Sequence, residues 1–269
     1  MEVKKIMKNE SKTLFIPLYG KAKVSREGLI LKDKKAEEIW EAEGFALHGK
    51  AKSKWLAYFM GMRSAAIDEW TMERIHACPK AMVLHIGCGL DSRVLRVGTM
   101  ECDWYDIDLT EVIDVRKQYY AEHEHYKMIA GNAEEPSEWL KDIPKDTEAI
   151  VVMEGISMYL DPDKLKELFL ALQEHFTTVS LIMDVYTSFG VKASKYKNPV
   201  NTVGAGVMNG IDDPKILELN QGILMTKKLS LTPPHFVEQL SGFDKAFFQK
   251  MFTGKTADRI YRMYEYKMN

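Results

Sequence analysis

The chain has 269 residues, and its 37 Lys and Arg nearly balance its 39 Asp and Glu, for a formal net charge of −2. A general nucleic-acid binder usually carries a basic excess, so this charge argues against that class. The three cysteines are an odd number without CxxC spacing, which excludes a disulfide framework and argues against a zinc site. The first 15 residues lack the apolar stretch that is typical of a signal peptide, and no apolar run approaches the roughly 18 residues of a membrane span. We therefore expect a cytoplasmic protein without nucleic-acid, membrane or metal partners.

Residues 1–76 are predicted to be helical. Asp33 can cap a helix that ends at Gly44, because Asp is a common N-cap and Gly commonly follows the last turn. Two more helices are expected over 51–60 and 64–76, where apolar residues recur at helical spacing.

Between residues 80 and 187, apolar runs alternate with helical stretches. The runs predict strands at 81–87, 102–109, 126–132, 148–155 and 178–187. The clearest helix lies before the last strand, with Asp161 as its cap and Pro162 at its first position. Strands that alternate with helices form βαβ units, so we expect an α/β fold with a doubly wound, mostly parallel sheet covered on both faces.

The last third of the chain is less regular. The stretch NPVNTVGAGVMNGIDDP is rich in Gly, Asn and Pro and is interpreted as a loop or lid. Two short helices are expected after the turn at Pro233 and Pro234. Residues 258–269 alternate in part and predict a final strand, which would pair antiparallel at the edge of the sheet.

The first predicted strand ends in a glycine-containing loop, Gly87-Cys88-Gly89, and a helix follows. Glycines let the backbone approach a ligand closely, and a helix start offers free N–H groups and a positive dipole end. An ordinary tight turn is the alternative. Position 92 is Ser where the dinucleotide fingerprint GxGxxG has its third glycine, which argues against NAD or FAD.

Carboxylates follow two of the other predicted strands. Asp108 lies at the end of the second strand, where a carboxylate can accept hydrogen bonds from both hydroxyls of a ribose. Helix capping is the alternative role for Asp108 or for its neighbour Asp106. Glu154 ends the fourth strand, and a carboxylate buried there needs a partner. That partner is either a cationic or polar ligand or an internal salt bridge.

Four motifs in order, MRSAAIDEW, HIGCGLDSR, WYDIDLTEVIDVRKQYY and MEGISMYL, resemble the leucine carboxyl methyltransferase family. The resemblance is to its branch of tetracenomycin-type polyketide O-methyltransferases. It covers residues 13–187, includes KTLFIPLYGKA near the start and fades beyond. It implies a Rossmann-like class I methyltransferase fold that binds S-adenosylmethionine and releases S-adenosylhomocysteine.

The resemblance also implies a role for each motif residue. Arg63 would contact the carboxylate of the cofactor's methionine part, and Glu154 would face its amino group. Gly87 and Gly89 would line the methionine portion, and Asp108 would hold the ribose. An α-carboxylate suits a bidentate Arg, and an ammonium suits a carboxylate.

At the adenine end the chain departs from the family pattern. Asn132 and Ala133 stand where the family often has Asp-Leu, although Asn can still donate or accept at the adenine N6 edge. Tyr159 would help to wall the pocket. Lys21 or Lys23 would match a basic residue near the family's N-terminus.

With the resemblance, we expect one methyltransferase domain over the whole chain. Its expected parts are an N-terminal helical segment (1–76), a cofactor-binding core (80–187), an acceptor-pocket cap (188–257) and the final strand (258–269). Candidate lining residues of the acceptor pocket are Met208, Phe236, Phe243, Phe247 and Phe248, although aromatic residues at helical spacing more often form core.

The expected reaction is an in-line attack of a small molecule's carboxylate or hydroxyl oxygen on the sulfonium methyl. A carboxylate is already ionised at neutral pH and needs no general base. For a hydroxyl acceptor the candidate base is His235, although a loop His is more often simply solvated. His85 and Cys88 are interpreted as packed residues.

Three alternatives stay open at this stage. The chain could methylate the C-terminal carboxylate of a protein, which an open, shallow acceptor site would favour. It could be a non-catalytic sensor of S-adenosylmethionine, which would bind the cofactor without turnover. The third alternative is a nicotinamide oxidoreductase, which the missing third glycine of the dinucleotide fingerprint opposes.

Overall fold

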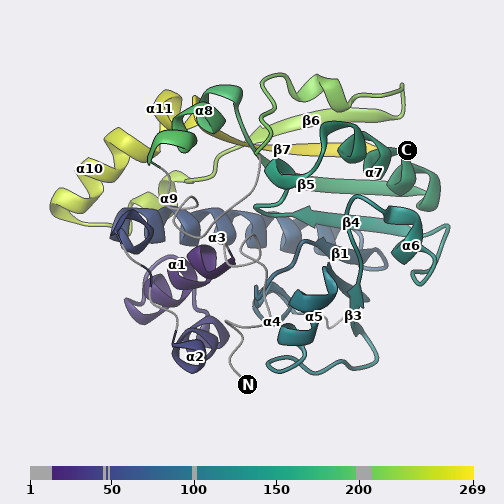
Figure 1. Ribbon diagram of the computed structural model, residues 1–269, viewed down its shortest axis with the longest axis horizontal. Helices are drawn as coiled ribbons and strands as arrows, with labels where there is room; N and C mark the ends of the chain where they lie inside the picture. The colour runs from purple at the N-terminus through teal and green to yellow at the C-terminus, as the bar shows by residue number, and fades with distance from the viewer. Residues whose placement is uncertain (1–13, 45–46, 48, 99–101, 198–207) are drawn as a thin grey trace.

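The computed structural model describes residues 14–44, 47, 49–98, 102–197 and 208–269. Up to residue 77 the described residues form helices and no strand, and beyond it strands and helices alternate (Figure 1). The helices are α1 (Phe15–Arg26), α2 (Lys34–Glu43), α3 (Lys54–Ala77), α4 (Arg93–Val97), α5 (Thr110–Arg116), α6 (Pro136–Leu140), α7 (Pro162–His175), α8 (Ser188–Lys197), α9 (Pro234–Val237), α10 (Gly242–Phe252) and α11 (Gly254–Asp258). The strands are β1 (Met82–Ile86), β2 (Trp104–Asp108), β3 (Tyr126–Ala130), β4 (Glu148–Met153), β5 (Thr178–Tyr186), β6 (Ile223–Leu229) and β7 (Tyr261–Met268). Short 3-10 turns occupy Gly49–Lys52, Ser157–Tyr159 and Pro214–Leu217.

Within the described residues, seven strands form a mixed sheet in the order β3-β2-β1-β4-β5-β7-β6. Strands β1 to β5 are parallel, and β7 runs antiparallel between β5 and β6. Strands β1 to β3 follow one another towards one edge of the sheet, whereas β4 and β5 follow one another towards the other edge. The strand order therefore reverses between β1 and β4, which flank a topological switch point. Ligands of open α/β sheets bind at the carboxyl ends of the strands at such a point. The predicted doubly wound α/β fold is confirmed.

The edge of the sheet differs from the prediction. The final strand exists as β7, but β6 pairs with its outer side, so β7 is internal and the segment 188–257 contributes to the sheet. The pairing shifts register between Met225 and Lys227, and an irregularity of this kind breaks the period-two pattern that marks a strand. Lysines are also typical of edge strands, where they discourage pairing with other chains.

Helix α3 is also longer than expected, because the two helices predicted over 51–60 and 64–76 are one 24-residue helix. A glycine near its middle does not end it. A Cβ at Gly61 would lie 2.8 Å from Cγ2 of Val24, so the glycine permits a close crossing with α1. Helix α2 follows the prediction: Asp33 accepts a hydrogen bond from the N–H of Ala36 and Gly44 is left-handed.

Helices cover both faces of the sheet (Figure 1). Along β4, Ile150 and Val152 pack into a cluster with the N-terminal helices, whereas Val151 and Met153 pack into a cluster with α6 and α7. Successive side chains of a strand point to opposite faces, which explains why a strand buried on both sides is apolar throughout. Helix α7 begins as predicted, with the Asp161 side chain accepting two backbone N–H groups.

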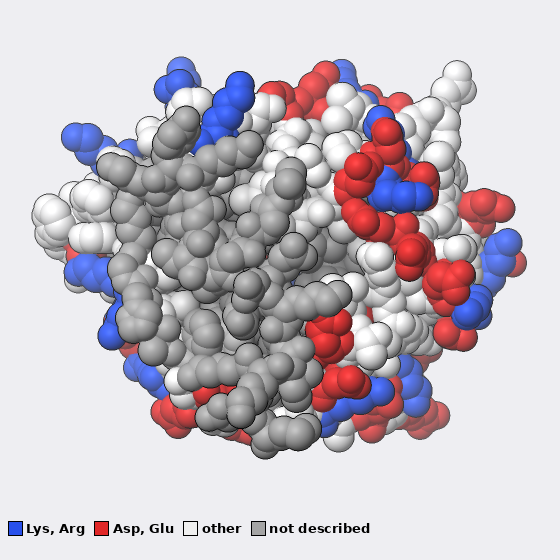
Figure 2. All heavy atoms as spheres, viewed as in Figure 1, with Lys and Arg blue, Asp and Glu red and all other residues white. Residues whose placement is uncertain are grey.

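The charged surface is mixed in sign. Figure 2 shows acidic and basic side chains interspersed along the rim of one face. In the described part of the chain, no helix has the length and apolar character needed to cross a membrane. No group of three or more His, Cys, Asp and Glu side chains in that part is arranged to hold a metal ion.

Candidate functional site

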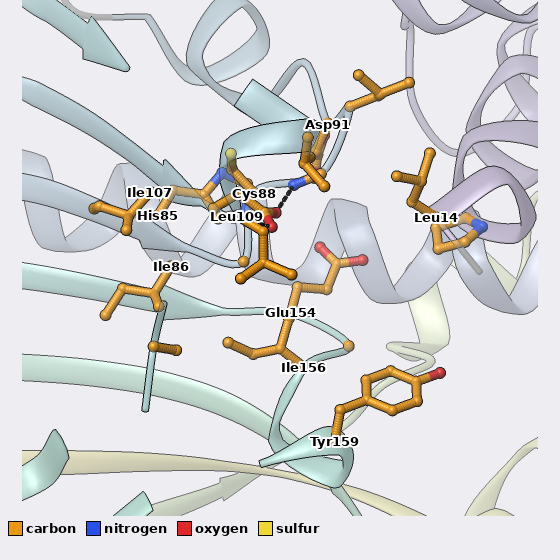
Figure 3. Close-up of a pocket in the computed structure, with 18 of the residues that line it drawn as sticks. Leu14, His85, Ile86, Cys88, Asp91, Ile107, Leu109, Glu154, Ile156 and Tyr159 are labelled. Carbon is orange, nitrogen blue, oxygen red and sulfur yellow. Dashed lines mark hydrogen bonds between the residues drawn. The ribbon is translucent and has the colours of Figure 1, made fainter. Parts of the chain in front are cut away.

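A cavity of about 530 Å³ lies at the switch point, where the loops after β1, β2, β3 and β4 meet helices α1 and α3. The structure brings together around it all eight residues to which the sequence assigned a cofactor role. These are Arg63, Gly87, Gly89, Asp108, Asn132, Ala133, Glu154 and Tyr159. In Figure 3, Glu154 projects from the end of β4 towards the space between Asp91 and Leu14.

The loop after β1 depends on its two glycines. Gly87 has a φ of 71°, and a Cβ there would lie 2.1 Å from Cγ2 of Ile156. Gly89 has a φ of 53°, also in the left-handed region that favours glycine. The loop therefore passes directly against the turn after β4, and this close approach shapes the floor of the cavity.

Asp108 is held by backbone N–H groups. Its Oδ2 accepts a hydrogen bond of 2.7 Å from Gly89, and its Oδ1 accepts one of 2.8 Å from Leu109. Burial raises the pKa of Asp108 to about 6, against the effect of these two donors. Helix α5 begins without a side-chain cap, so neither Asp108 nor Asp106 has the capping role that the sequence left open.

Glu154 takes part in a buried ion pair. Nε and Nη2 of Arg63 lie 3.0 and 2.8 Å from its Oε1, and Nη2 of Arg93 donates to its Oε2. Burial alone would raise the pKa of Glu154, but the two guanidinium groups outweigh it and hold the pKa at about 2. The internal salt bridge that the sequence left open is therefore present, and it lies in the cavity wall.

Arg63 lines the cavity and has protein partners of its own. Its Nη1 lies 3.0 Å from the hydroxyl of Tyr261 and 3.1 Å from Oδ2 of Asp184. Together with the contacts to Glu154, these occupy all three nitrogens of the guanidinium group. A bidentate fork for a ligand carboxylate, as expected from the sequence, would require Arg63 to exchange one of these protein partners.

Lys21 and Lys23 differ clearly in their surroundings. Lys21 is buried and lines the cavity, and its Nζ lies 3.0 Å from Oδ1 of Asp91. Lys23 forms an ion pair with Glu27 on the surface of α1. Asp91 was not among the predicted site residues, although its place two residues after Gly89 was a usable signal.

The adenine-end candidates lie at the end of β3 and after β4. Asn132 and Ala133 follow β3 and line the cavity. Oδ1 of Asn132 accepts the N–H of Glu134, which fixes the amide orientation. Tyr159 lies in the 3-10 turn after β4 and lines the cavity.

The residues expected to line an acceptor pocket do not line this cavity. They are Met208, Phe236, Phe243, Phe247 and Phe248. Phe248 is fully buried in the core, whereas Phe243 is 72% exposed. The structure instead lines the cavity with Tyr186 at the end of β5 and Tyr261 at the start of β7. Neither tyrosine lies in a motif that the sequence analysis singled out.

The candidate base and the two packed residues can also be placed. His235 does not line the cavity; it is exposed, and its Nε2 lies 2.9 Å from Oε1 of Glu69. His85 is buried beside Asp106, and burial lowers its pKa. Burial raises the pKa of the Cys88 thiol well above its usual value, as expected for a packed, unreactive cysteine.

Curated proteins with a similar sequence are methyltransferases by name. The chain is 32% identical over 157 residues to the tetracenomycin polyketide synthesis O-methyltransferase TcmP of Streptomyces glaucescens, a match that spans 58% of each chain. It is 23% identical over 232 residues to the S-adenosyl-L-methionine-dependent methyltransferase dpfgK of Gibberella zeae, covering 77% of this chain and 76% of that one.

Solved structures of similar fold are also methyltransferases. Magnesium protoporphyrin IX methyltransferase of Synechocystis PCC 6803, with bound S-adenosylhomocysteine, superposes with a TM-score of 0.52 at 10% identity, covering 88% of this chain and 93% of that one. Geranyl diphosphate C-methyltransferase of Streptomyces coelicolor A3(2) gives 0.50 at 16% identity, covering 84% and 86%. At these identities the likeness concerns the fold, which is that of the class I methyltransferases.

The sequence model of one family, described as leucine carboxyl methyltransferase, matches residues 5–173. That range contains β1 to β4 and most of the residues that line the cavity. The chain therefore belongs to the leucine carboxyl methyltransferase family.

Proposed function

We propose that the chain is an S-adenosylmethionine-dependent O-methyltransferase whose acceptor is a small molecule with a carboxylate group. The observation that carries the proposal is the cavity at the switch point. A glycine loop, a carboxylate at the end of β2 and the buried pair of Arg63 in α3 with Glu154 after β4 meet there. The names of the two curated relatives support the reaction class. A hydroxyl acceptor is the second candidate.

The residues present fit S-adenosylmethionine at each of its polar ends. Asp108 has one N–H partner on each oxygen, which leaves lone pairs for the two ribose hydroxyls. Glu154 stays ionised and receives the ammonium of the amino-acid part, and Lys21 receives its carboxylate. Asn132 and Ala133 border the adenine. The cofactor supplies a methyl group activated by the positive charge of its sulfonium sulfur.

The lining of the cavity favours an acceptor that arrives ionised. Asp91 pairs with Lys21, Glu154 pairs with two arginines, and Glu134 accepts the N–H of Asp161. His85 is enclosed between Asp106 and Arg93 and its pKa is lowered by burial. These groups are committed to protein partners, whereas a carboxylate acceptor needs none of them as a base.

The acceptor class is tested with methyl-labelled S-adenosylmethionine and a panel of carboxylic acids with phenols of matched size. Mild alkali releases methanol from a methyl ester but not from an aryl methyl ether. Alkali-labile label on an acid supports the proposal, and alkali-stable label on a phenol supports the hydroxyl alternative. Cofactor binding without transfer to any member of a broad panel would favour a sensor and contradict the proposal.

A further inference from the structure

Arg116, at the end of α5, is fully buried beneath the ribose end of the cavity. Its Nε donates to the hydroxyl of Tyr126 at 3.1 Å, and its Nη2 donates to Oδ2 of Asp106. The guanidinium carbon lies 4.1 Å from the centre of the Tyr120 ring. The side chain is thus fixed from several sides, which is the setting in which a planar guanidinium group positions its remaining donors precisely.

The third guanidinium nitrogen of Arg116 reaches the glycine loop. Nη1 of Arg116 donates to the backbone carbonyl of Gly89 at 3.0 Å. The N–H of the same glycine donates to Oδ2 of Asp108 at 2.7 Å. Gly89 has a φ of 53°, and because glycine has no side chain its backbone is not held in this conformation by side-chain packing. The loop is therefore held at this residue by Arg116 on one side and by Asp108 on the other.

We propose that Arg116 is a positioning residue for cofactor binding, which fixes the backbone at Gly89 and through it the orientation of the Asp108 carboxylate. Arg116 is not one of the residues that line the cavity, so it acts without touching the ligand. The inference rests on the proposed function, because it takes the ribose of S-adenosylmethionine to be the ligand of Asp108.

The charge of Arg116 has a second, separable effect. The charged and titratable groups that act on Asp108 are Arg116 from α5, Asp106 from β2 and the buried thiol of Cys88 in the glycine loop. Burial and Asp106 raise the pKa of Asp108, and Arg116 lowers it. A lysine at position 116 keeps this charge but loses the fork, whereas a methionine loses both.

The test is calorimetric titration of wild type, Arg116→Lys and Arg116→Met with S-adenosylhomocysteine and 5′-methylthioadenosine. The second ligand carries the adenosine but no amino-acid part. Since a hydrogen bond from a charged donor is lost, we expect both ligands to bind roughly tenfold more weakly to Arg116→Lys. Over a pH series, the affinity midpoint stays near the wild-type value in Arg116→Lys and moves to higher pH in Arg116→Met.

Arg93 provides the matched control, because it is equally buried and supports the other end of the cavity through Glu154. Arg93→Lys should weaken S-adenosylhomocysteine and leave 5′-methylthioadenosine within about threefold of wild type. A general loss of folding would affect both ligands in both variants and would not reproduce this division between the two ends.

If Arg116→Lys does not fold, Tyr126→Phe tests the same link. It removes only the hydroxyl that accepts from Arg116 and donates to Asp106 at 2.7 Å. A parallel loss of affinity for both ligands supports the proposal. Wild-type affinity and pH midpoint in the Arg116 variants, or in Tyr126→Phe, would overturn it. Failure of wild type to bind either ligand would instead contradict the proposed function.

Discussion

Nε and Nη2 of Arg63 converge on the same oxygen of Glu154, at 3.0 and 2.8 Å, although the two residues are 91 positions apart. The pair joins the middle of α3 to the end of β4 inside the cavity wall. Both side chains are nearly inaccessible to solvent, so each charge depends on the other for compensation. The pair thus supports the fold and, on our account, the amino-acid end of the cofactor.

Glu154→Gln keeps the shape of the side chain and removes its charge. Because two buried arginines lose their shared carboxylate, we expect the free energy of unfolding to fall by about 3 kcal/mol. S-adenosylhomocysteine should bind at least about tenfold more weakly, since its ammonium loses an ionic partner. Urea unfolding and calorimetry measure the two effects. Glu41→Gln, which disrupts the exposed pair with Arg26, is the control and should change neither quantity.

The Glu154 carboxylate also makes the folded chain less stable at low pH. The pKa of Glu154 is about 2 in the folded chain, below its ordinary value of 4.5. Its contribution to the free energy of unfolding is therefore complete above the ordinary value and is lost as the pH falls towards 2. In Glu154→Gln this part of the acid destabilisation should be missing. An unchanged pH dependence of urea unfolding would contradict the assignment.

Asp108 should make cofactor binding depend on pH. Its pKa is raised to about 6, so it takes up a proton in the folded chain as the pH falls through that value. In the proposed function the ionised carboxylate accepts both ribose hydroxyls, so affinity for S-adenosylhomocysteine should fall below pH 6. In Asp108→Asn the affinity should be weaker and flat across the same range. A wild-type profile in this variant would rule out Asp108 as the titrating group.

The raised pKa of Asp108 also makes the free energy of unfolding depend on pH. Between the ordinary value of 3.8 and about 6, the folded chain binds the Asp108 proton more tightly than the unfolded chain does. The Asp108 contribution to the free energy of unfolding therefore falls as the pH rises through that interval. This is opposite to the effect of Glu154, so unfolding must be followed in both variants to separate them.

Gly87→Ala tests the close approach between the glycine loop and the turn after β4. The new Cβ would meet Ile156 and would also occupy a positive φ. Gly28→Ala is the matched control, because Gly28 has a φ of 69° but open space around it. The control should lose about 1 kcal/mol from backbone strain alone. Gly87→Ala should lose more and should also abolish cofactor binding; equal effects would refute the steric argument.

Lys21 and Lys23 give a second matched pair. Lys21→Met removes the buried ammonium that lines the cavity and pairs with Asp91, so affinity for S-adenosylhomocysteine should fall by roughly tenfold or more. Lys23→Met removes a surface pair on the same helix and should leave the affinity unchanged. The reverse ranking would show that the wrong lysine faces the cofactor.

His235→Ala should leave methyl transfer within about twofold of wild type, because His235 is exposed and pairs with Glu69 outside the cavity. The measurement is the initial rate with whichever acceptor the labelled panel identifies. A loss of an order of magnitude or more would mean that a conformational change brings this side chain to the acceptor, and would revive the hydroxyl mechanism.

The strands of the core could be predicted because each is a short apolar run between helical stretches. The residues that line the cavity could be predicted for a related reason: Gly87, Asp108 and Glu154 all follow parallel strands, whose carboxyl ends meet at one edge. The partners of these residues could not, since Arg93 and Arg116 are charged residues in short helices and nothing in their spacing indicates burial. Strand β6 was missed because its register shift and its lysines hide the alternation.

The expected aromatic lining of an acceptor pocket stays a prediction, because the cavity at the switch point is lined by other residues. A phenylalanine stripe at helical spacing reports that a helix has an apolar face, but not which part of the molecule that face meets. In α10, Phe248 meets the core and Phe243 remains exposed. The tyrosines that do line the cavity, Tyr186 and Tyr261, stand opposite each other on adjacent antiparallel strands. Both strands were predicted, but the sequence does not give the register that pairs these two residues.

The most direct test of the account is calorimetric titration of the wild-type chain with S-adenosylmethionine, S-adenosylhomocysteine and NAD. We predict dissociation constants on the order of micromolar for the first two and no binding of NAD. Glu154→Gln and Asp108→Asn should each weaken binding of the first two. No binding of either adenosyl compound, or binding of NAD alone, would contradict the assignment of the cavity as a methyltransferase cofactor site.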